Sequence, residues 1–198
     1  MSVVSTARQW AMAGECGSRM AVCCCWSGII CLEKARMFNV VLVEPEIPPN
    51  TGNIGRLCLA TASHLHLVKP LGYSLDDKAL RRAGLDYWHE VNLTLWDSFE
   101  QLCTQHSGVR FWFITTKSRR SYWDATFEPG DFLVFGRETK GLPESLLEAN
   151  SQRTLTIPMA SESTRSLNLA TAVGVVLYEA VRQVRKGRGR VARRIPRQ

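Results

Sequence analysis

The sequence predicts an α/β protein built on a parallel sheet that helices cover on both faces. Short apolar and β-branched runs alternate with helix-like segments from residue 39 to residue 184. Such alternation is typical of strand–helix–strand units with parallel strands. Several predicted strands also end abruptly in loops rich in glycine, proline and charge, and loops of this kind hold the ligands of open α/β sheets.

The first predicted strand leads through a proline-rich loop into a helix. Residues 39–43 form a continuous apolar run, and the prolines within residues 44–49 prevent the strand from continuing. Asn50 and Thr51 are good helix N-caps, and apolar residues recur at helical spacing behind them. We therefore expect a helix over residues 51–63.

Two further strands and a short helix are predicted in residues 64–93. Residues 65–68 are predicted to form a strand. His64, just before it, and His66 would lie on the same side of this strand, because strand side chains alternate. No third ligand lies near this pair, so core or surface histidines are favoured over a metal or catalytic pair. A helix over residues 76–83 and a strand over residues 90–93 follow.

The second half of the chain repeats the alternation. The predicted elements are a helix, a strongly β-prone strand, a second strand, a short helix, a short strand and a long amphipathic helix, over residues 96–106, 110–116, 132–135, 144–149, 154–157 and 166–184. Small residues on the last helix would allow another helix to approach closely. The body of the protein is thus predicted to be one domain, residues 37–184.

Charge is distributed unevenly along the chain. The formal net charge is +7, yet eight Lys or Arg and no acid lie in residues 182–198, and residues 1–36 also carry more bases than acids. The body is therefore mildly acidic, and the basic tail, residues 185–198, is either a sequence-blind RNA-binding segment or a solvated end. No apolar run approaches the length of a membrane span, which predicts a protein without a membrane anchor.

Cysteine usage favours the cytoplasm. Five of the seven cysteines lie in the first 31 residues, in a spacing without the paired Cys-x-x-Cys of zinc sites, so a metal site there is disfavoured. Cys58 and Cys103 are predicted to be reduced core thiols of a cytosolic protein. Residues 1–36 imitate a secretory signal poorly, and we interpret them as a disordered extension or as sequence upstream of a start at Met37.

Four loops are predicted to meet at the carboxyl edge of the sheet, namely residues 44–50, 115–120, 136–141 and 158–165. The sharpest is Val134–Pro143, where an apolar strand ends at Gly136 and charge follows; the alternative interpretation is a tight turn with solvated charges. The sequence contains neither a dinucleotide fingerprint nor a phosphate-binding loop, and no nucleophile–histidine constellation falls on these loops.

Three segments together resemble the three motifs of the SPOUT methyltransferases. They are residues 50–56, residues 135–143, and residues 157–159 with 165–169. Residues 43–50, 85–87 and 115–117 look specifically like the TrmL (YibK) family. The resemblance extends over residues 37–184, and the combination of motifs is far more specific than any one of them.

This resemblance implies a cytoplasmic, homodimeric SPOUT fold with a deep C-terminal trefoil knot. It also implies S-adenosyl-L-methionine as methyl donor and no metal. The implied reaction is 2′-O-methylation of the wobble nucleotide, cytidine or 5-carboxymethylaminomethyluridine, of leucine tRNAs, with the anticodon stem-loop as partner. Because proteins almost never thread their chains, only the family resemblance supports the knot.

The resemblance also assigns roles to residues. Strand ends at Ile114, Gly136 and Ile157 would contact the adenine, and Ser166 and Leu167 would close over the cofactor. Arginine is effectively always protonated, so we interpret Arg56 as a phosphate clamp and stabiliser of the nascent alkoxide rather than as a base. Asn168 would position the hydroxyl, and Glu138 would hold the loops or Arg56. The alternative interpretation of Arg56 is an ordinary cation on the surface of a helix.

RNA binding is predicted from charge near the pocket. The cations expected to ring it are Lys117, Arg119, Arg120, Arg137, Lys140 and Arg165. Residues 81–88 mix arginines with aromatic rings, as either an RNA surface or an ordinary helix end does. Two other functions remain open: a non-catalytic RNA-binding protein of the same fold, and a SPOUT 2′-O-methyltransferase for another RNA.

Overall fold

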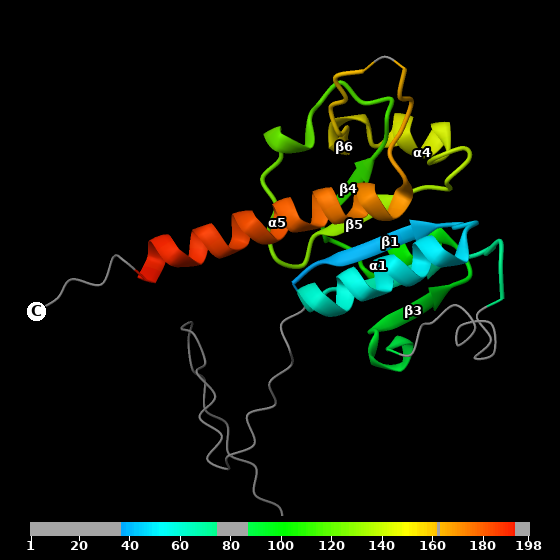
Figure 1. Cartoon of the computed structure of the whole chain (residues 1–198), viewed down its shortest axis with the longest axis horizontal. Coiled ribbons are helices and arrows are strands. Elements are labelled where there is room, and N and C mark those ends of the chain that lie inside the picture. Colours follow the sequence, from blue (N-terminus) through cyan, green and yellow to red (C-terminus); the bar gives the residue numbers. More distant parts are fainter. Residues whose placement is uncertain (1–36, 75–86, 162, 193–198) are drawn as a thin grey trace, which may run out of the picture. The chain divides into compact units, whose positions relative to one another are not determined.

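The computed structural model describes residues 37–74, 87–161 and 163–192. Their core is a parallel sheet with the strand order β3-β2-β1-β5-β4-β6 (Figure 1). The strands are β1 (Asn39–Val43), β2 (His64–Val68), β3 (Leu93–Trp96), β4 (Phe111–Ile114), β5 (Phe132–Phe135) and β6 (Thr154–Leu155). All five pairings are parallel, which confirms the predicted parallel α/β sheet.

Helices cover both faces of this sheet. The helices are α1 (Pro48–Thr61), α3 (Phe99–Gln105), α4 (Glu144–Ala149) and α5 (Leu169–Ala192), with 3-10 turns η1 (Trp88–Glu90), η2 (Tyr122–Asp124) and η3 (Ser151–Arg153). Alternate residues of β1 point into separate cores: Val40 and Leu42 pack with α1 and α5, whereas Val41 and Val43 pack with α3 and α4. Continuous apolar strands are what a sheet buried on both faces requires.

Helix α1 begins three residues earlier than predicted. The N-cap is Ile47, and Pro48 opens the helix. The prediction of a cap at Asn50 or Thr51 was wrong because proline is well tolerated in the first turn, where its missing N–H would have no intrahelical acceptor. Asn50 and Thr51 are consequently buried within the first turn.

The boundaries around β3 also differ from the prediction. Residues 88–90 form η1, and the strand lies at Leu93–Trp96 because it pairs with β2 in the register Leu65↔Leu93. As a result, Trp96 belongs to the strand, and α3 is shorter than predicted. The predicted helix over residues 76–83 lies outside the described residues.

The last helix starts late and runs long. The backbone carbonyl of Asn168 accepts from Ala172 N at 2.9 Å, and its side-chain Oδ1 accepts from Ala170 N at 2.9 Å. Asn168 therefore caps α5, which leaves Ser166 and Leu167 in the preceding loop rather than in the predicted helix. The helix continues to Ala192, so its backbone includes the first part of the predicted tail.

The two histidines of β2 are core residues, as favoured from the sequence. His64 and His66 stack with ring centroids 4.2 Å apart, and His66 is 1% exposed. His66 Nδ1 accepts from Trp96 Nε1 at 3.0 Å, so its Nε2 carries the proton and donates to Asn39 Oδ1 at 3.2 Å. These bonds satisfy a buried imidazole without a charge.

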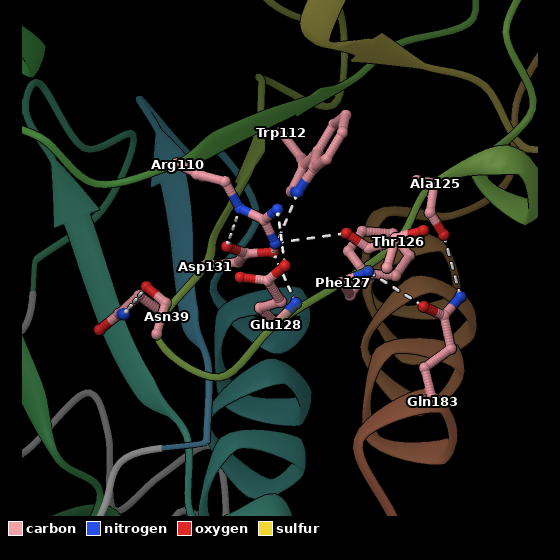
Figure 2. Close-up of polar contacts among 10 residues, drawn as sticks. Asn39, Arg110, Trp112, Ala125, Thr126, Phe127, Glu128, Asp131 and Gln183 are labelled. Atoms are coloured by element: carbon pink, nitrogen blue, oxygen red, sulfur yellow. Dashed lines mark hydrogen bonds and ion pairs between the residues drawn. The ribbon is translucent and has the colours of Figure 1, made fainter. Parts of the chain in front are cut away.

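A buried polar cluster closes the amino edge of the sheet (Figure 2). Asp131, 3% exposed, accepts from Arg110 Nε at 2.8 Å and Nη2 at 2.7 Å and from Trp112 Nε1 at 3.1 Å. The hydrogen bond with Asp131 raises the pKa of Arg110. Nearby, Gln183 of α5 accepts from Phe127 N at 3.0 Å, which joins α5 to the segment before β5. This cluster lies at the opposite edge of the sheet from the four loops predicted to converge.

Native Cys58 is expected to resist alkylation. Burial in the core raises the pKa of its thiol to about 12 from an ordinary 9.0. The thiolate is the reactive form, so at pH 8 its population falls by roughly 1,000-fold relative to an exposed thiol. Peptide mass mapping after iodoacetamide treatment should find Cys58 unmodified in the native chain and modified in guanidinium, with half-buried Cys103 reacting earlier. Equal rates in both conditions would contradict this.

Candidate functional site

A cavity of about 530 Å³ lies at the carboxyl ends of the central strands. The lining residues are Ile47, which is the N-cap of α1, Asn50 of α1, residues 114–117, residues 135–142, Ile157, Met159 and residues 165–169. All four loops predicted to converge contribute to it. The volume lies within the usual range for small-molecule sites.

Each residue predicted to contact the cofactor lines this cavity. Ile114 and Gly136 stand at the ends of β4 and β5, and Ile157 follows β6. Ser166 and Leu167 line it from the loop that precedes α5. The topology thus brings together residues that are far apart in the sequence, as a parallel sheet requires.

Gly136 is required by the fold of its own loop. Arg137 and Gly141 pair across this loop, with Gly141 N donating to Arg137 O at 2.9 Å, and Gly141 adopts a φ of +68°. A Cβ on Gly136 would lie 2.1 Å from the Gly141 carbonyl carbon and 2.3 Å from Leu142 N. Backbone of the same loop therefore excludes a side chain at position 136, whether or not a ligand is bound.

Glu138 holds the start of α1. Its carboxylate accepts from Glu46 N at 2.9 Å, Ile47 N at 3.3 Å and Asn50 Nδ2 at 3.0 Å. The N-cap, Ile47, has no side-chain acceptor, so the carboxylate supplies both the capping bonds and a negative charge at the positive end of the helix. Glu138 was predicted to hold either the loops or Arg56. In the structure it binds the loop that leads into α1, and not Arg56.

A chain of hydrogen bonds joins the three motif segments at the cavity. Asn168 Nδ2 donates to Asn50 Oδ1 at 3.0 Å, and Asn50 Nδ2 in turn donates to Glu138. Sequence reasoning missed Asn50 as a site residue, although it stands in the first motif. Its place in that motif was the signal that the sequence offered, because its burial and its two partners are visible only in the structure.

Two more contacts fasten residues 44–47 to the 136–141 loop. Arg137 Nη2 forms an ion pair with Glu44. Thr139 N donates to Glu46 Oε2 at 3.1 Å, and Thr139 Oγ1 donates to the same carboxylate. Glu46 was not predicted as a site residue, yet it belongs to the framework that shapes the cavity.

Arg56 is exposed and does not line the cavity of its own chain. Its guanidinium lies over the ring of Tyr87, 4.5 Å from the centroid, and the Tyr87 hydroxyl donates to Gly52 O at 2.9 Å. Trp88 packs so closely on Gly55 that an added Cβ would approach its ring to 2.7 Å. Tyr87 and Trp88 therefore pack against α1, and they do not form the free RNA-stacking surface that the sequence left open.

The predicted ring of cations is only partly available. Lys117, Arg137, Lys140 and Arg165 line the cavity. Lys117 pairs with Glu144, as Arg137 does with Glu44. Lys140, Arg165 and the more distant Arg119 have no salt bridge to any residue that the structure describes, so they can neutralise an anionic ligand.

Glu138→Ala is expected to lower the free energy of unfolding by about 2 kcal/mol. Removing the carboxylate leaves two backbone N–H groups and Asn50 without their acceptor, and water replaces part of the loss. Denaturant unfolding measures the change. Glu148→Ala, which removes an exposed carboxylate from α4, is the matched control and should stay within about 0.5 kcal/mol of the wild type. Equal stability of the two variants would contradict the capping role.

The described residues contain neither a cluster of three or more metal-ligating side chains nor a helix long and apolar enough to cross a membrane.

Comparison with known proteins agrees with this site. The model of the SpoU rRNA Methylase family matches residues 37–178. A tRNA (cytidine(34)-2′-O)-methyltransferase of Saccharophagus degradans is 50% identical over 152 residues, 75% of this chain and 96% of the relative. One of the same name from Escherichia coli is 46% identical over 149 residues, 75% of this chain and 94% of the relative.

Solved structures share the fold. A structure described as "Structural insights into the 2-OH methylation of C/U34 on tRNA" matches with a TM-score of 0.70 and 46% identity, over 75% of this chain and 97% of that one. The SpoU methyltransferase AviRb of Streptomyces viridochromogenes, in complex with AdoMet, matches with a TM-score of 0.64 and 25% identity, over 75% and 58%. These matches confirm the predicted resemblance, and the chain belongs to the SpoU rRNA Methylase family.

Proposed function

We propose that this protein transfers the methyl group of S-adenosylmethionine to the ribose 2′-hydroxyl of nucleotide 34 of tRNA. The relatives at 46–50% identity carry this activity in their names. The observation that carries the proposal is the cavity itself, at whose edge one hydrogen-bonded chain joins Asn50, Glu138 and Asn168. Leucine tRNAs carrying cytidine or 5-carboxymethylaminomethyluridine at this position are the substrates that the TrmL resemblance implies.

The cavity suits S-adenosylmethionine by size and lining. Apolar side chains at Ile114, Ile157 and Leu167 offer surfaces for an adenine ring, and the strand ends offer backbone N–H and C=O groups for its edge. When bound, S-adenosylmethionine supplies a methyl group on a sulfonium, a good leaving group. The protein must then orient the hydroxyl in line with that group.

Residue roles follow from chemistry and placement. Asn168 Nδ2 has two hydrogens, of which Asn50 takes one, so the other remains to orient the ribose hydroxyl. Arg56 would clamp a phosphate and stabilise the developing alkoxide. Glu138 acts through α1, whose first turn it holds, and is a positioning residue in this scheme.

A homodimer is part of the proposal. Arg56 lies outside its own chain's cavity, so it would act at the cavity of a second copy. The outer surfaces of α1 and α5 expose Leu59 at 38% and Tyr178 at 50%, which suits burial against that copy. Light scattering should give twice the mass of one chain, and a monomer at the concentrations used for catalysis would refute the dimer.

A deep trefoil knot and a cytoplasmic location complete the proposal. The chain leaves β6 at the edge of the sheet, yet α5 packs on the side of β1 with α1. Met159 and residues 165–168 line the cavity beside the ends of β4 and β5, which is where a threaded segment would pass. A crystal structure whose backbone is free of entanglement would contradict the knot. Fluorescent tagging tests the location.

Two measurements test the function. Isothermal titration should detect S-adenosylmethionine binding, and mass mapping of tRNA from a deletion strain should find nucleotide 34 unmethylated, with restoration by the wild-type gene. A folded protein that binds tRNA but not S-adenosylmethionine would instead be the non-catalytic RNA-binding protein. Methylation found on another RNA alone would reassign the substrate.

A further inference from the structure

One aromatic ring stands in solvent near the outer edge of the sheet. Trp123 of η2 is 63% exposed, more than any other large apolar side chain of the described residues. Tyr122, Ala125 and Phe127 beside it are buried in the core. The core is thus filled by its neighbours, and the indole, whose ring centroid lies 5.5 Å from that of Tyr122, leaves most of its surface in solvent. Large exposed aromatic surface is typical of binding sites.

The turn that carries Trp123 is firmly held. Trp123 N donates to Ser121 Oγ at 3.2 Å. Arg120 donates from Nη2 to Asp124 O at 3.1 Å and from Nη1 to Gln152 O at 3.3 Å, so its guanidinium connects η2 with η3. A ring presented by a rigid turn loses little conformational entropy on binding, which favours a contact role.

Three arginines belong to or flank the two turns that Arg120 connects. Arg119, next to Arg120, and Arg153 of η3 are exposed, and neither has a salt bridge to any residue that the structure describes. The hydrogen-bond partners of the Arg120 guanidinium are backbone carbonyls, so no carboxylate neutralises it among the residues that the structure describes. Asp124 is the acid within the turn. An exposed ring among unneutralised arginines matches a ligand with flat faces and negative charges.

The cavity lies a few residues away. Ser121 pairs with Thr156, and Tyr122 N donates to Thr156 O at 2.9 Å. The next residue, Ile157, lines the cavity, as does Lys117 at the start of the same connecting segment. A polymer whose reacting nucleotide occupies the cavity therefore has neighbouring nucleotides within reach of η2.

We infer that Trp123 is a stacking platform for an unpaired base of the substrate RNA, with Arg119 and Arg153 contacting the adjacent phosphates. Stacking on an aromatic face is how proteins bind splayed-out RNA bases, and it tolerates any base identity. The inference rests on the proposed function and extends it by naming where the RNA is held outside the reacting site.

The test compares the affinity of full-length variants for a short RNA hairpin with an unpaired loop and for a fully paired RNA duplex. Trp123→Ala should weaken hairpin binding by about 5- to 100-fold, the range for one lost base–aromatic stack. Trp123→Phe should retain much of the affinity. Duplex binding should change little in either variant, because a duplex offers no free base face.

Charge is tested separately. Arg119→Ala should weaken the binding of both RNAs. It should also reduce the salt dependence of binding by about one released counterion. Leu95→Ala and Lys69→Ala are the matched controls, since they remove an exposed apolar side chain and a cation at or beside β3, the opposite edge of the sheet. Neither should alter RNA binding.

The outcomes separate this inference from the proposed function. Unchanged hairpin affinity in a folded Trp123→Ala variant would overturn the stacking platform. An equal loss of affinity for hairpin and duplex would overturn it as well, and so would a change of oligomeric state without a change in RNA binding. S-adenosylmethionine titration of the same variants should match the wild type. A wild-type protein that binds the hairpin through Trp123 but never methylates RNA would overturn the proposed function and leave the platform standing.

Discussion

Replacing Arg56 with alanine is expected to lower the methylation rate at saturating tRNA by roughly 100- to 1,000-fold, the usual cost of losing one electrostatic stabiliser of a transition state. Cofactor affinity should stay nearly unchanged, because the role proposed for Arg56 is toward the phosphate and ribose of the RNA, and Arg56 lines no part of the cavity of its own chain. The guanidinium is packed on Tyr87 rather than on any cavity residue, so its removal leaves the cavity walls intact.

Single-turnover kinetics and S-adenosylmethionine titration measure the two quantities separately. Arg56→Lys should recover part of the rate, since it keeps the charge but loses the planar fork that grips a phosphate. Lys69→Ala removes an exposed cation outside the site and should leave the rate near that of the wild type. Parallel loss of rate and cofactor affinity in folded Arg56→Ala would refute the assigned role, and an unchanged rate would leave Arg56 a plain surface cation.

Much of the fold was predictable because local patterns and tertiary structure agree. The strand Phe132–Phe135 and the helix Glu144–Ala149 have the predicted bounds, since a continuous apolar run and the following Gly and Pro mark them clearly. Convergence of the four loops also followed from one rule, that parallel strands end at the same edge. Site residues that the family resemblance implied, such as Ile114 and Ile157, do line the cavity at that edge.

What escaped prediction depends on contacts between distant segments. The start of α1 is stabilised by Glu138, about 90 residues away, and no local signal at Ile47 reports such a cap. The position of β3 is set by its register with β2, which a propensity scan does not contain. Asn50 became recognisable as a site residue only when Glu138 and Asn168 lay on either side of it.

Gly136→Ala is expected to remove cofactor binding and to cost more than about 3 kcal/mol of unfolding free energy. The new Cβ would stand 2.1 Å from the Gly141 carbonyl carbon and 2.3 Å from Leu142 N, distances that no side-chain rotation relieves because both atoms belong to the backbone. The loop must open, and overpacking of this severity lies at the upper end of measured effects. Residues 136–141 would then no longer form their wall of the cavity.

Gly141→Ala provides a sharp comparison within the same loop. A Cβ there meets nothing within 4 Å, so the substitution adds only the strain of a φ of +68° for a residue with a side chain. That strain costs about 1–2 kcal/mol, and S-adenosylmethionine binding should survive. Denaturant unfolding and isothermal titration on both variants make the test. If the two substitutions prove equally harmful, conformational strain and not the close approach of backbone explains the glycines, and the account given for Gly136 fails.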